Sequence, residues 1–572
     1  MVIAPDNVAD IDPHAQDGQK TRPSTWIALA GLAVATLLPF ITKPFNIDDP
    51  FYLAVAKHIT EAPFDFYGFE FNWYGTLEQV TYANHAPASA YFMAFVGTIA
   101  GWSELAMHAA FMLPAIALLL GTYAAATRLC DQPVLASAIT WFCPALFVSA
   151  TSVMTDVWMA AFFVWAIALW MRGIDESRFG LLLAAIAAAS MAGLMKYFGV
   201  TVIGLLALYA IGRRHPLRRW ALLLPIPIFV LAAYEALTYA MYGQGLVSST
   251  FLFADEGRGA AGIAWYDWIV SGFSFTGGGL AAAALVMLLA WSRKMAAVWC
   301  VLFLALLARF ATIESYRGLA LRGSDGVDWV AAIHLAAFVT LGAQLLALTA
   351  WRLLQERTLE VLVLAAWIVG VFVFSTYVNW SVTARTFVPM APAAGILAVR
   401  AARFDDGRNP WRYGVTLAAA ALALLVAWGD MGWSRSVRDT ATMFNDGFRG
   451  NPAKVYFQGH WGFQHYTDPD VMQALDAERT ELYEGDIVIT PKNNSVSSRL
   501  PARFRARTER VLAGEGRWSN TMLGAAGVGF YSDLFGPLPF RIGPGPGEIY
   551  LVTQVGTPAE GLDGDAKESP PQ

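Results

Sequence analysis

Long apolar segments recur through residues 25–430 of this chain, and this feature limits its fold more than any other. Most of the segments approach the roughly 17–25 residues that a helix needs to cross a bilayer. Inside a bilayer only helices and closed barrels satisfy every backbone polar group, so the sequence predicts a mainly α, polytopic bundle of about 13 transmembrane helices. The predicted spans are 26–41, 87–101, 103–128, 154–172, 179–195, 197–212, 219–241, 266–291, 295–311, 328–350, 359–378, 387–400 and 412–430.

The composition supports a membrane protein and excludes several soluble classes. Hydrophobic residues make up 56% of the 572 positions and charged residues 15%, against about 25% charged in typical soluble domains. A net charge of -5 without a basic run excludes a nucleic-acid-binding protein. The three cysteines, Cys130, Cys143 and Cys300, fall in apolar segments, so neither a disulfide framework nor a cysteine metal site is predicted.

Basic residues between the spans indicate the orientation of the chain. Arginine and lysine gather at every second connection, and these connections are therefore the predicted cytoplasmic ones. This alternation extends back to the N-terminus if the stretch 132–152, which Pro144 interrupts, is a re-entrant or half-length helix that does not cross the membrane. The predicted cytoplasmic connections are 213–219, 293–294, 352–357 and 400–412.

Four parts follow from this orientation. They are a cytoplasmic N-terminal tail (1–24), a transmembrane domain (25–430), an extracytoplasmic C-terminal domain (431–556) and a disordered tail (557–572) that is rich in glycine, proline and acids. A large outer loop (43–86) within the second part is rich in aromatic and acidic residues, which is typical of helices that lie at the membrane surface.

The C-terminal region is predicted to be a small α/β domain. Strand-like runs occupy 455–457, 487–490 and 549–555, and the stretch 468–483 has a helical pattern. Aromatic and histidine residues at 455–466 could bind an acceptor, or they could form a core strand and its turn.

An acidic pair follows the first span. Asp48 and Asp49 precede a proline and a predicted helix, so one of them could be a general base while the other binds a cation or orients a hydroxyl. Aspartate is also among the best helix N-caps, and this second interpretation explains the pair equally well. No cofactor is predicted, although two adjacent carboxylates could hold a divalent cation.

Other charged residues lie at predicted outer ends of spans, where an unpaired charge is costly. Lys196 could hold a lipid phosphate, or it could reach the headgroups from an apolar helix. Asp156 lies at the same depth. Arg317 and Arg385 are outer cations that need an anion, which could be a lipid phosphate or an acid of the first loop. Glu314 shares the loop of Arg317, and His85 starts the second span.

In their order and predicted location, these residues resemble the motifs of the C-class membrane glycosyltransferases. The branch that fits holds the protein O-mannosyltransferases and the lipid A aminoarabinose transferase. Ala86 and Thr386 depart from the usual proline and tyrosine of that pattern, and the first acidic motif reads Asp-Asp-Pro. The matching residues are Asp48-Asp49, Asn84-His85-Ala86-Pro87, Asp156, Met195-Lys196-Tyr197, and Arg385-Thr386-Phe387 followed by Pro389 and Pro392.

The resemblance implies an inverting transfer of one sugar from a polyprenyl-phosphate donor to an acceptor lipid, glycan or protein. The transfer would take place at the outer face of the membrane, among membrane lipids. Compact loops and the lack of retention signals favour the periplasmic face of an inner (plasma) membrane over the endoplasmic reticulum. On this resemblance Asp48 is the general base with Asp49 as its partner. The resemblance and the outer charges together assign Lys196, Arg385 and Arg317 to the donor phosphate, and Asp156, His85 and Glu314 to the sugar or acceptor. Asp156 could instead order Lys196.

A transporter or flippase of lipid-linked sugars is the alternative. It predicts charged groups near the middle of the membrane on discontinuous helices. Here the charged groups gather at predicted outer ends, and Glu235 is the main exception.

Overall fold

The computed structural model describes residues 22–82, 85–402, 411–497, 500, 505–514 and 516–556. Residues 1–21 of the predicted N-terminal tail, Asn84 of the predicted motif and the whole predicted tail 557–572 lie outside this part of the chain.

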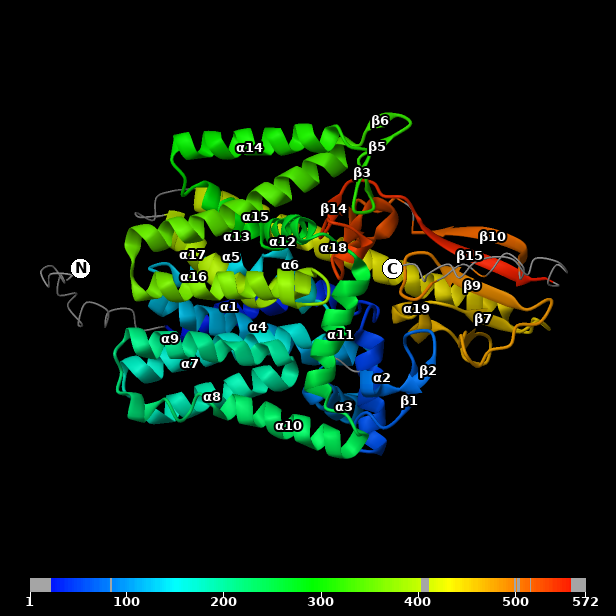
Figure 1. The fold of residues 1–572 in the computed structure, drawn as a ribbon, viewed down its shortest axis with the longest axis horizontal. Helices are drawn as coiled ribbons and strands as arrows, with labels where there is room; N and C mark the ends of the chain where they lie inside the picture. The colour runs from blue at the N-terminus through cyan, green and yellow to red at the C-terminus, as the bar shows by residue number, and fades with distance from the viewer. Residues whose placement is uncertain are drawn as a thin grey trace, which may run out of the picture.

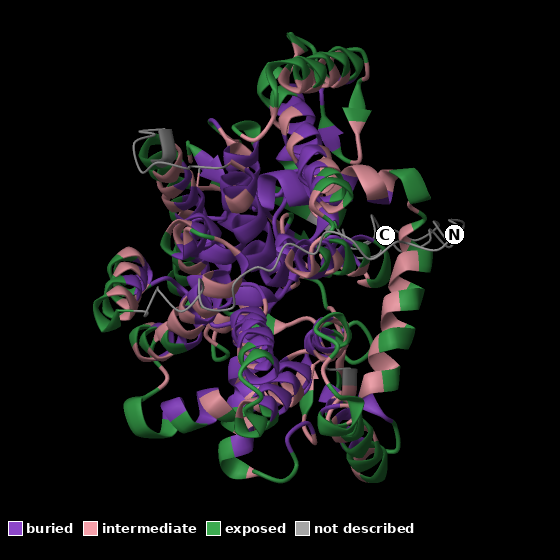
Figure 2. Ribbon diagram, turned by 90° about the vertical axis from the view of Figure 1, so that its left-hand side faces the viewer, coloured by how far each residue is buried: buried purple, intermediate pink, exposed green. Residues whose placement is uncertain are grey.

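Most of the chain is a bundle of helices, with a small sheet domain at one end (Figure 1). This arrangement confirms the predicted fold class. Figure 2 shows that buried residues occupy the centre of the bundle and exposed ones its outer helices. The bundle helices are α1 (Pro23–Leu37), α3 (Ala88–Ala100), α4 (Glu104–Leu129), α5 (Pro133–Trp141), α6 (Pro144–Ala150), α7 (Thr155–Asp175), α8 (Phe179–Met195), α9 (Val202–Gly212), α10 (Ile226–Tyr242), α12 (Trp265–Gly279), α13 (Ala281–Leu288), α14 (Arg293–Ala311), α15 (Trp329–Glu356), α16 (Leu359–Val373), α17 (Ala391–Ala402) and α18 (Trp411–Phe448).

Within the described residues, seven helices are long and apolar enough to cross a membrane, or ten if each of three bent helix pairs is one span. The predicted number was about 13, and the two sets differ in both directions. The ten include the pair α5 and α6, which the sequence predicted not to cross. They leave out the predicted span 387–400 and three predicted spans that are shorter apolar helices: Ala88–Ala100, Phe179–Met195 and Tyr197–Gly212. The pair α5 and α6 bends by 68°, which matches the broken helix predicted around Pro144. These apolar helices make the chain a multi-pass membrane protein.

Ion pairs hold the predicted cytoplasmic connections together at the end of the bundle away from the sheet domain. Arg213 pairs with Glu360 at 3.0 Å, and Arg400 pairs with Glu356 at 2.8 Å. The connections at 213–219, 352–357 and 400 therefore share one face, as the charge pattern predicted.

Two helices run across the other end of the bundle, roughly perpendicular to it: α2 (Asp49–Glu61) and α11 (Leu246–Ala261) (Figure 1). The outer loop 43–86 was predicted to contain such a surface helix, and α2 is that helix. The segment 242–265 lies between the predicted spans 219–241 and 266–291, so the sequence predicts no more than a connection there. The bend of 90° between α10 and α11 turns the chain across the bundle end instead.

The C-terminal domain is built on α18, whose 38 residues run past the predicted boundary at 431. Its sheet has the strand order β10-β15-β9-β7-β8, with β7 parallel to both of its neighbours and β15 antiparallel to both of its own. The strands are β7 (Val455–Phe457), β8 (Gln473–Ala474), β9 (Ile487–Pro491), β10 (Arg505–Ala513) and β15 (Glu548–Val555).

All three predicted strands of this domain are confirmed, but the predicted helix at 468–483 is wrong. The segment contains β8 and a turn, because the Asp476 carboxylate accepts the backbone N–H groups of Glu478 and Arg479 and also that of Leu77 in the outer loop. These contacts with a distant segment outweigh the local helical pattern. A short helix, α19 (Trp461–Tyr466), lies earlier in the domain.

Short strand pairs complete the fold. The hairpin of β1 and β2 lies in the outer loop, two hairpins (β3 with β4, β5 with β6) follow α14, and two further pairs lie in the C-terminal domain. Their bounds are β1 (Glu70–Asn72), β2 (Leu77–Gln79), β3 (Ser315–Tyr316), β4 (Leu319–Ala320), β5 (Arg322–Gly323), β6 (Gly326–Val327), β11 (Ser519–Asn520), β12 (Met522–Leu523), β13 (Val528–Gly529) and β14 (Arg541–Ile542).

A buried ion pair joins the first span to α18. Lys43 Nζ lies 2.5 Å from Asp430 Oδ2 and also donates to the hydroxyls of Thr151 and Ser152, and both charged side chains are at most 2% exposed. The other oxygen of Asp430 accepts the Thr521 hydroxyl, so this pair also anchors the C-terminal domain.

We expect Lys43→Ala to destabilise the protein by about 3–5 kcal/mol, because it leaves the Asp430 charge buried without its partner. Thermal unfolding of the purified protein in detergent measures this as a lower midpoint. Arg449→Ala is the matched control: it breaks a pair with Asp468 in which the arginine is 61% exposed, a kind typically worth less than about 1 kcal/mol. Equal midpoints for the two variants would contradict the structural role of the Lys43 pair.

Candidate active site

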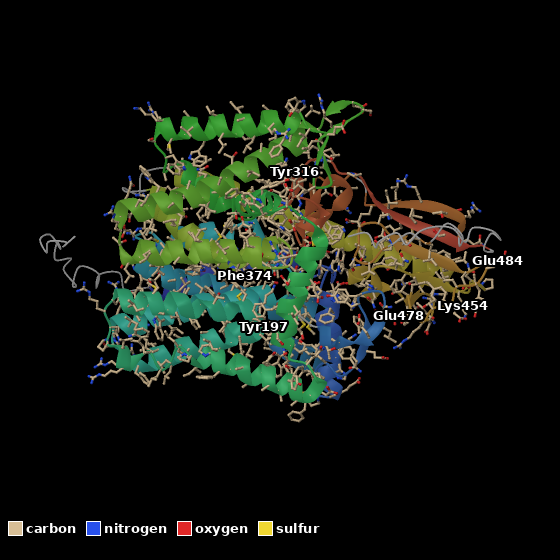
Figure 3. All side chains as sticks on the ribbon, viewed as in Figure 1. Tyr197, Tyr316, Phe374, Lys454, Glu478 and Glu484 are labelled. Atoms are coloured by element: carbon tan, nitrogen blue, oxygen red, sulfur yellow. The ribbon has the colours of Figure 1, made fainter. Side chains whose placement is uncertain are left out.

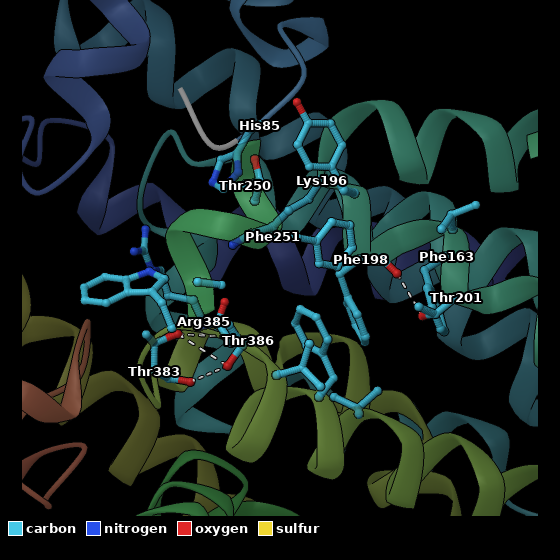
Figure 4. A pocket seen from close by; sticks show the side chains of 18 of the residues that line it. His85, Phe163, Lys196, Phe198, Thr201, Thr250, Phe251, Thr383, Arg385 and Thr386 are labelled. Carbon is cyan, nitrogen blue, oxygen red and sulfur yellow. Dashed lines mark hydrogen bonds between the residues drawn. The ribbon is translucent and has the colours of Figure 1, made fainter. Parts of the chain in front are cut away.

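A cavity of about 720 Å³ opens where the bundle meets α2 and α11. Figure 4 shows His85, Lys196 and Arg385 toward one end of it and Phe163 and Thr201 toward the other. In Figure 3, the wall residues Tyr197 and Phe374 lie in the bundle, whereas Lys454 and Glu484 lie at the far edge of the C-terminal domain. His85, Lys196 and Arg385 make one end of the cavity polar, and most of its other lining residues are apolar.

Asp48 lies at the polar end and forms an ion pair with Arg385. Its Oδ2 atom lies 2.6 Å from Arg385 Nη1, and both residues line the cavity. Asp48 occupies the N-cap position of α2, but its side chain makes no capping hydrogen bond. The structure therefore uses this carboxylate as a partner of Arg385 and not as a helix cap.

Arg385 belongs to a short 3-10 helix, Ala384–Met390, that follows α16. Besides Asp48, its guanidinium contacts the sulfur of Met154 at 3.1 Å and lies over the ring of Tyr531, 5.6 Å from the ring centre. Tyr531 belongs to the C-terminal domain, so both parts of the chain surround this cation.

Lys196 and Asp156 form the second ion pair of the site. Lys196 follows the last residue of α8, and its Nζ atom lies 2.7 Å from Asp156 Oδ1 near the start of α7. The Lys196 side chain lines the cavity and is only 13% exposed, so it points into the protein and not away from its surface. Asp156 is almost fully buried behind it.

Asp49 points away from the cavity. Its two oxygens accept the backbone N–H groups of Asn46 and Val153, each at 3.2 Å, and burial raises the pKa of its carboxyl to about 7. Because the oxygens of Asp48 and Asp49 face different partners, the two carboxylates do not form the shared cation site that the sequence allowed. No group of three or more possible metal ligands occurs among the described residues.

Arg317 and Glu314 lie outside the cavity. Arg317 Nη1 lies 2.5 Å from Asp533 Oδ2, so its anion comes from the C-terminal domain and not from the first loop. Glu314 is exposed, and its backbone carbonyl accepts the N–H groups of Leu321 and Arg322. The structure therefore separates these two residues from Arg385, with which the sequence grouped them.

His85 does line the cavity, and its ring stacks on Tyr52 with centres 6.0 Å apart. It thus lies with Asp48, Lys196 and Arg385, as predicted.

Sequence reasoning missed an aromatic wall on the Asp48 side. Phe51 contacts Trp73, while Tyr74, Phe253 and Trp380 form a chain of ring contacts with centres 6.5 and 6.0 Å apart. The aromatic content of the outer loop was a usable signal for the first three. No sequence signal indicated Phe253 on α11 or Trp380 in the loop before Arg385, because their positions depend on how α11 crosses the bundle end.

The apolar remainder of the cavity lies between α9 and α16. These helices meet where Gly212 approaches Leu359, and residues of both line the space between them. Gly204 on α9 and Gly370 on α16 line this part, and open space surrounds the position of a Cβ atom on each. The result is an apolar groove that leads away from Lys196 and Arg385.

The fold and the cavity define a multi-pass membrane protein whose ionised site lies at one end of a helical bundle. Residues 84–239 match the family model described as dolichyl-phosphate-mannose-protein mannosyltransferase. This segment contains His85, Asp156 and Lys196. The match confirms the predicted resemblance to the C-class membrane glycosyltransferases of the protein O-mannosyltransferase branch. No curated protein matches the sequence.

Several solved structures are similar at low sequence identity. The apo oligosaccharyltransferase of Archaeoglobus fulgidus is 13% identical, with a TM-score of 0.47 over 80% of this chain and 64% of that one. ArnT from Cupriavidus metallidurans bound to undecaprenyl phosphate is 15% identical, with a TM-score of 0.40 over 82% and 94%. Arabinosyltransferase EmbB from Mycobacterium smegmatis is 13% identical, with a TM-score of 0.35 over 88% and 48%. This chain thus spans less than two thirds of the archaeal enzyme.

The raised pKa of Asp49 predicts a pH dependence of stability. Asp49 stays protonated in the folded protein up to about pH 7, whereas the unfolded chain releases this proton near its ordinary pKa of 3.8. The contribution of Asp49 to the free energy of unfolding therefore falls as the pH rises from about 4 to about 7. We expect the stability difference between Asp49→Asn and the wild type to shift in favour of the variant when the pH is raised from 5 to 7.5. Thermal midpoints measured at both pH values test this, and an unchanged or opposite difference would contradict it.

Proposed function

We propose that this chain transfers a sugar from a polyprenyl-phosphate donor to an acceptor hydroxyl at the bundle end that carries the cavity. One observation carries the proposal: two cations, Lys196 and Arg385, lie where an apolar groove begins. A polyprenyl-phosphate sugar has the matching form, an anionic phosphate between a long apolar chain and a polar sugar.

The donor phosphate would bind at Lys196 and Arg385, and its chain would lie between α9 and α16. Both cations are already paired, Lys196 with Asp156 and Arg385 with Asp48, so the phosphate would share or replace these carboxylates. Such charge-assisted bonds in a site shielded from water favour an anion strongly. The family description names a donor of this class.

Asp48 is the proposed general base. As the acceptor oxygen attacks the anomeric carbon, its proton passes to Asp48, a new C–O bond forms, and the bond from that carbon to the lipid phosphate oxygen breaks. The leaving phosphate keeps the electron pair of that bond, and Lys196 and Arg385 stabilise its charge. In-line attack of this kind inverts the anomeric centre and needs no covalent sugar intermediate.

The remaining predicted residues receive supporting roles. Asp156 holds Lys196 in place, and His85 faces the sugar or acceptor from the cavity wall. Asp49 fixes the start of α2 through backbone N–H groups and thereby orients Asp48. Glu314 and Arg317 lie outside the cavity, and no contact with donor or acceptor is proposed for them.

The aromatic wall near Asp48 suits a carbohydrate acceptor. The faces of a sugar ring carry apolar C–H groups, which stack on aromatic rings, while its hydroxyls point sideways to polar groups. Among a lipid, a glycan and a protein, the rings of Trp73, Tyr74 and Trp380 therefore favour the glycan or the sugar of a glycolipid.

The positive connections at the far end of the bundle support an orientation. If those connections are cytoplasmic, the cavity and the C-terminal domain face the periplasm of an inner (plasma) membrane. The donor would then be used on the outer leaflet.

The bent helix pairs are the one observation that favours a transporter of lipid-linked sugars, since discontinuous helices are typical of transporters. Glu235, however, which was the exception in the charge pattern, accepts the N–H groups of Val247 and Ser248 at the start of α11. This carboxylate caps a helix, and no ion site at the middle of the membrane needs it.

We expect Asp48→Asn to lower the rate of sugar transfer by about 10²- to 10⁴-fold, because the amide cannot accept the proton. The assay incubates purified protein in lipid with radiolabelled polyprenyl-phosphate sugars and membrane extract as acceptor, and it measures release of polyprenyl phosphate. Glu61→Gln is the matched control, since it neutralises an exposed carboxyl on the same helix.

Unchanged transfer by Asp48→Asn would contradict the assignment of the base. Absence of transfer by the wild type from every donor, together with movement of labelled lipid across the vesicle membrane, would favour the transporter instead.

Filling the groove should weaken binding of long-chain donors. In Gly204→Phe the new ring enters the open space beside α9, so we expect at least a tenfold rise in KM for a long-chain donor and a smaller rise for a short-chain one. Gly180→Phe adds the same ring to an exposed position of α8 that does not line the cavity. Equal effects of both variants on KM would contradict the proposed place of the lipid chain.

A further inference from the structure

The loop that carries Arg385 is held by a segment of the C-terminal domain. Ala384 donates its backbone N–H to the carbonyl of Phe530 at 2.8 Å, and Asp533 donates its own N–H to the carbonyl of Val382 at 2.9 Å. Two segments far apart in the sequence thus run alongside each other next to the cavity.

The side chain of Asp533 strengthens this contact. Its Oδ1 atom accepts the N–H of Val382 at 2.9 Å, and its Oδ2 atom pairs with Arg317. Asp533 is fully buried, so a carboxylate that is shielded from water fixes the backbone three residues before Arg385. This contact also explains why Arg317 lies outside the cavity.

Tyr531 forms the second part of the contact. Its ring lies under the Arg385 guanidinium, and its hydroxyl donates to Asp430 Oδ2 at 2.9 Å. Asp430 in turn is paired with Lys43 of the transmembrane part. The hydroxyl at the far edge of the tyrosine ring is therefore held by the buried ion pair of Lys43 with Asp430, which also accepts the Thr521 hydroxyl of the C-terminal domain.

We propose that the segment Phe530–Asp533 of the C-terminal domain is the positioning element of Arg385. Tyr531 supports the guanidinium face and Asp533 fixes the loop, so the arginine keeps its place when its bond to Asp48 is shared with or lost to an anion. Both are positioning residues, because neither lines the cavity. The inference rests on the proposed function, in which Arg385 binds the donor phosphate.

The physical reason lies in the flexibility of arginine. A guanidinium on a long side chain stabilises a leaving phosphate only if it is already held where the charge develops. Asp48 alone cannot hold it there, since Asp48 must also accept the acceptor proton. The ring of Tyr531 contributes an attraction to the cation that does not compete with the phosphate for hydrogen bonds.

A double-mutant cycle separates positioning from general stability. Tyr531→Leu is measured with Arg385 intact and again with Arg385→Ala, using kcat and donor KM for transfer. We expect Tyr531→Leu to lower kcat/KM about tenfold with Arg385 present and less than twofold without it, because the tyrosine acts through the arginine. Tyr531→Phe keeps the ring, and we expect it to retain at least a third of the wild-type kcat/KM.

An equal loss in both backgrounds would overturn the proposal, because it would mean that Tyr531 acts on the fold as a whole. An unchanged kcat/KM for Arg385→Ala alone would instead contradict the proposed function, so the two failures are distinguishable.

Asp533→Asn provides a second test that does not depend on the Tyr531 variants. The amide can still accept the N–H of Val382 but loses the charge that pairs with Arg317. We expect a partial loss of kcat/KM that disappears in the Arg385→Ala background, whereas a loss of the same size in both backgrounds would overturn the role of Asp533.

Discussion

Pairing of buried charges is the constraint on which the rest of this structure depends. An ionised side chain at the edge of a bilayer is costly unless it is paired. Four such pairs lie at the bundle end that carries the cavity, and three of them join segments that are distant in the sequence. They are Lys43 with Asp430, Asp48 with Arg385, Asp156 with Lys196, and Arg317 with Asp533. The same contacts that offset the cost of the charges therefore assemble the cavity and attach the C-terminal domain to it.

Two of these pairs, Asp48 with Arg385 and Asp156 with Lys196, differ from the others because their cations line the cavity. Lys196 and Arg385 can therefore change partners. Lys43 and Asp430 are buried in the core and can only hold the fold. In the proposed reaction a donor phosphate accepts hydrogen bonds from both cations and so weakens their bonds to the carboxylates. Asp48 thereby becomes available to accept the proton of the acceptor hydroxyl. The ion pair of Asp48 with Arg385 is in this account the resting form of the site, and donor binding makes the base available.

The sequence predicted much of this site, because charges in an apolar chain are few and their order is informative. Asp48, His85, Lys196 and Arg385 were expected at one end of the bundle and line one cavity. The direction of Asp49 could not be predicted, since adjacent residues at a helix start differ only in phase. The partner of Arg317 is Asp533, far along the chain, and no local pattern indicates such a contact.

The strand β10 was missed because its many charged residues are typical of a loop, although they suit the edge position it takes in the sheet. The helix predicted at 468–483 failed because Asp476 binds the outer loop instead.

The most direct test of the central claim is a structure of the protein in a lipid nanodisc with a polyprenyl phosphate bound. The account predicts density for the phosphate within hydrogen-bonding distance of Lys196 Nζ and the Arg385 guanidinium, with the chain between α9 and α16. Phosphate bound at the opposite end of the bundle, among the arginines of the predicted cytoplasmic connections, with the groove empty, would contradict it.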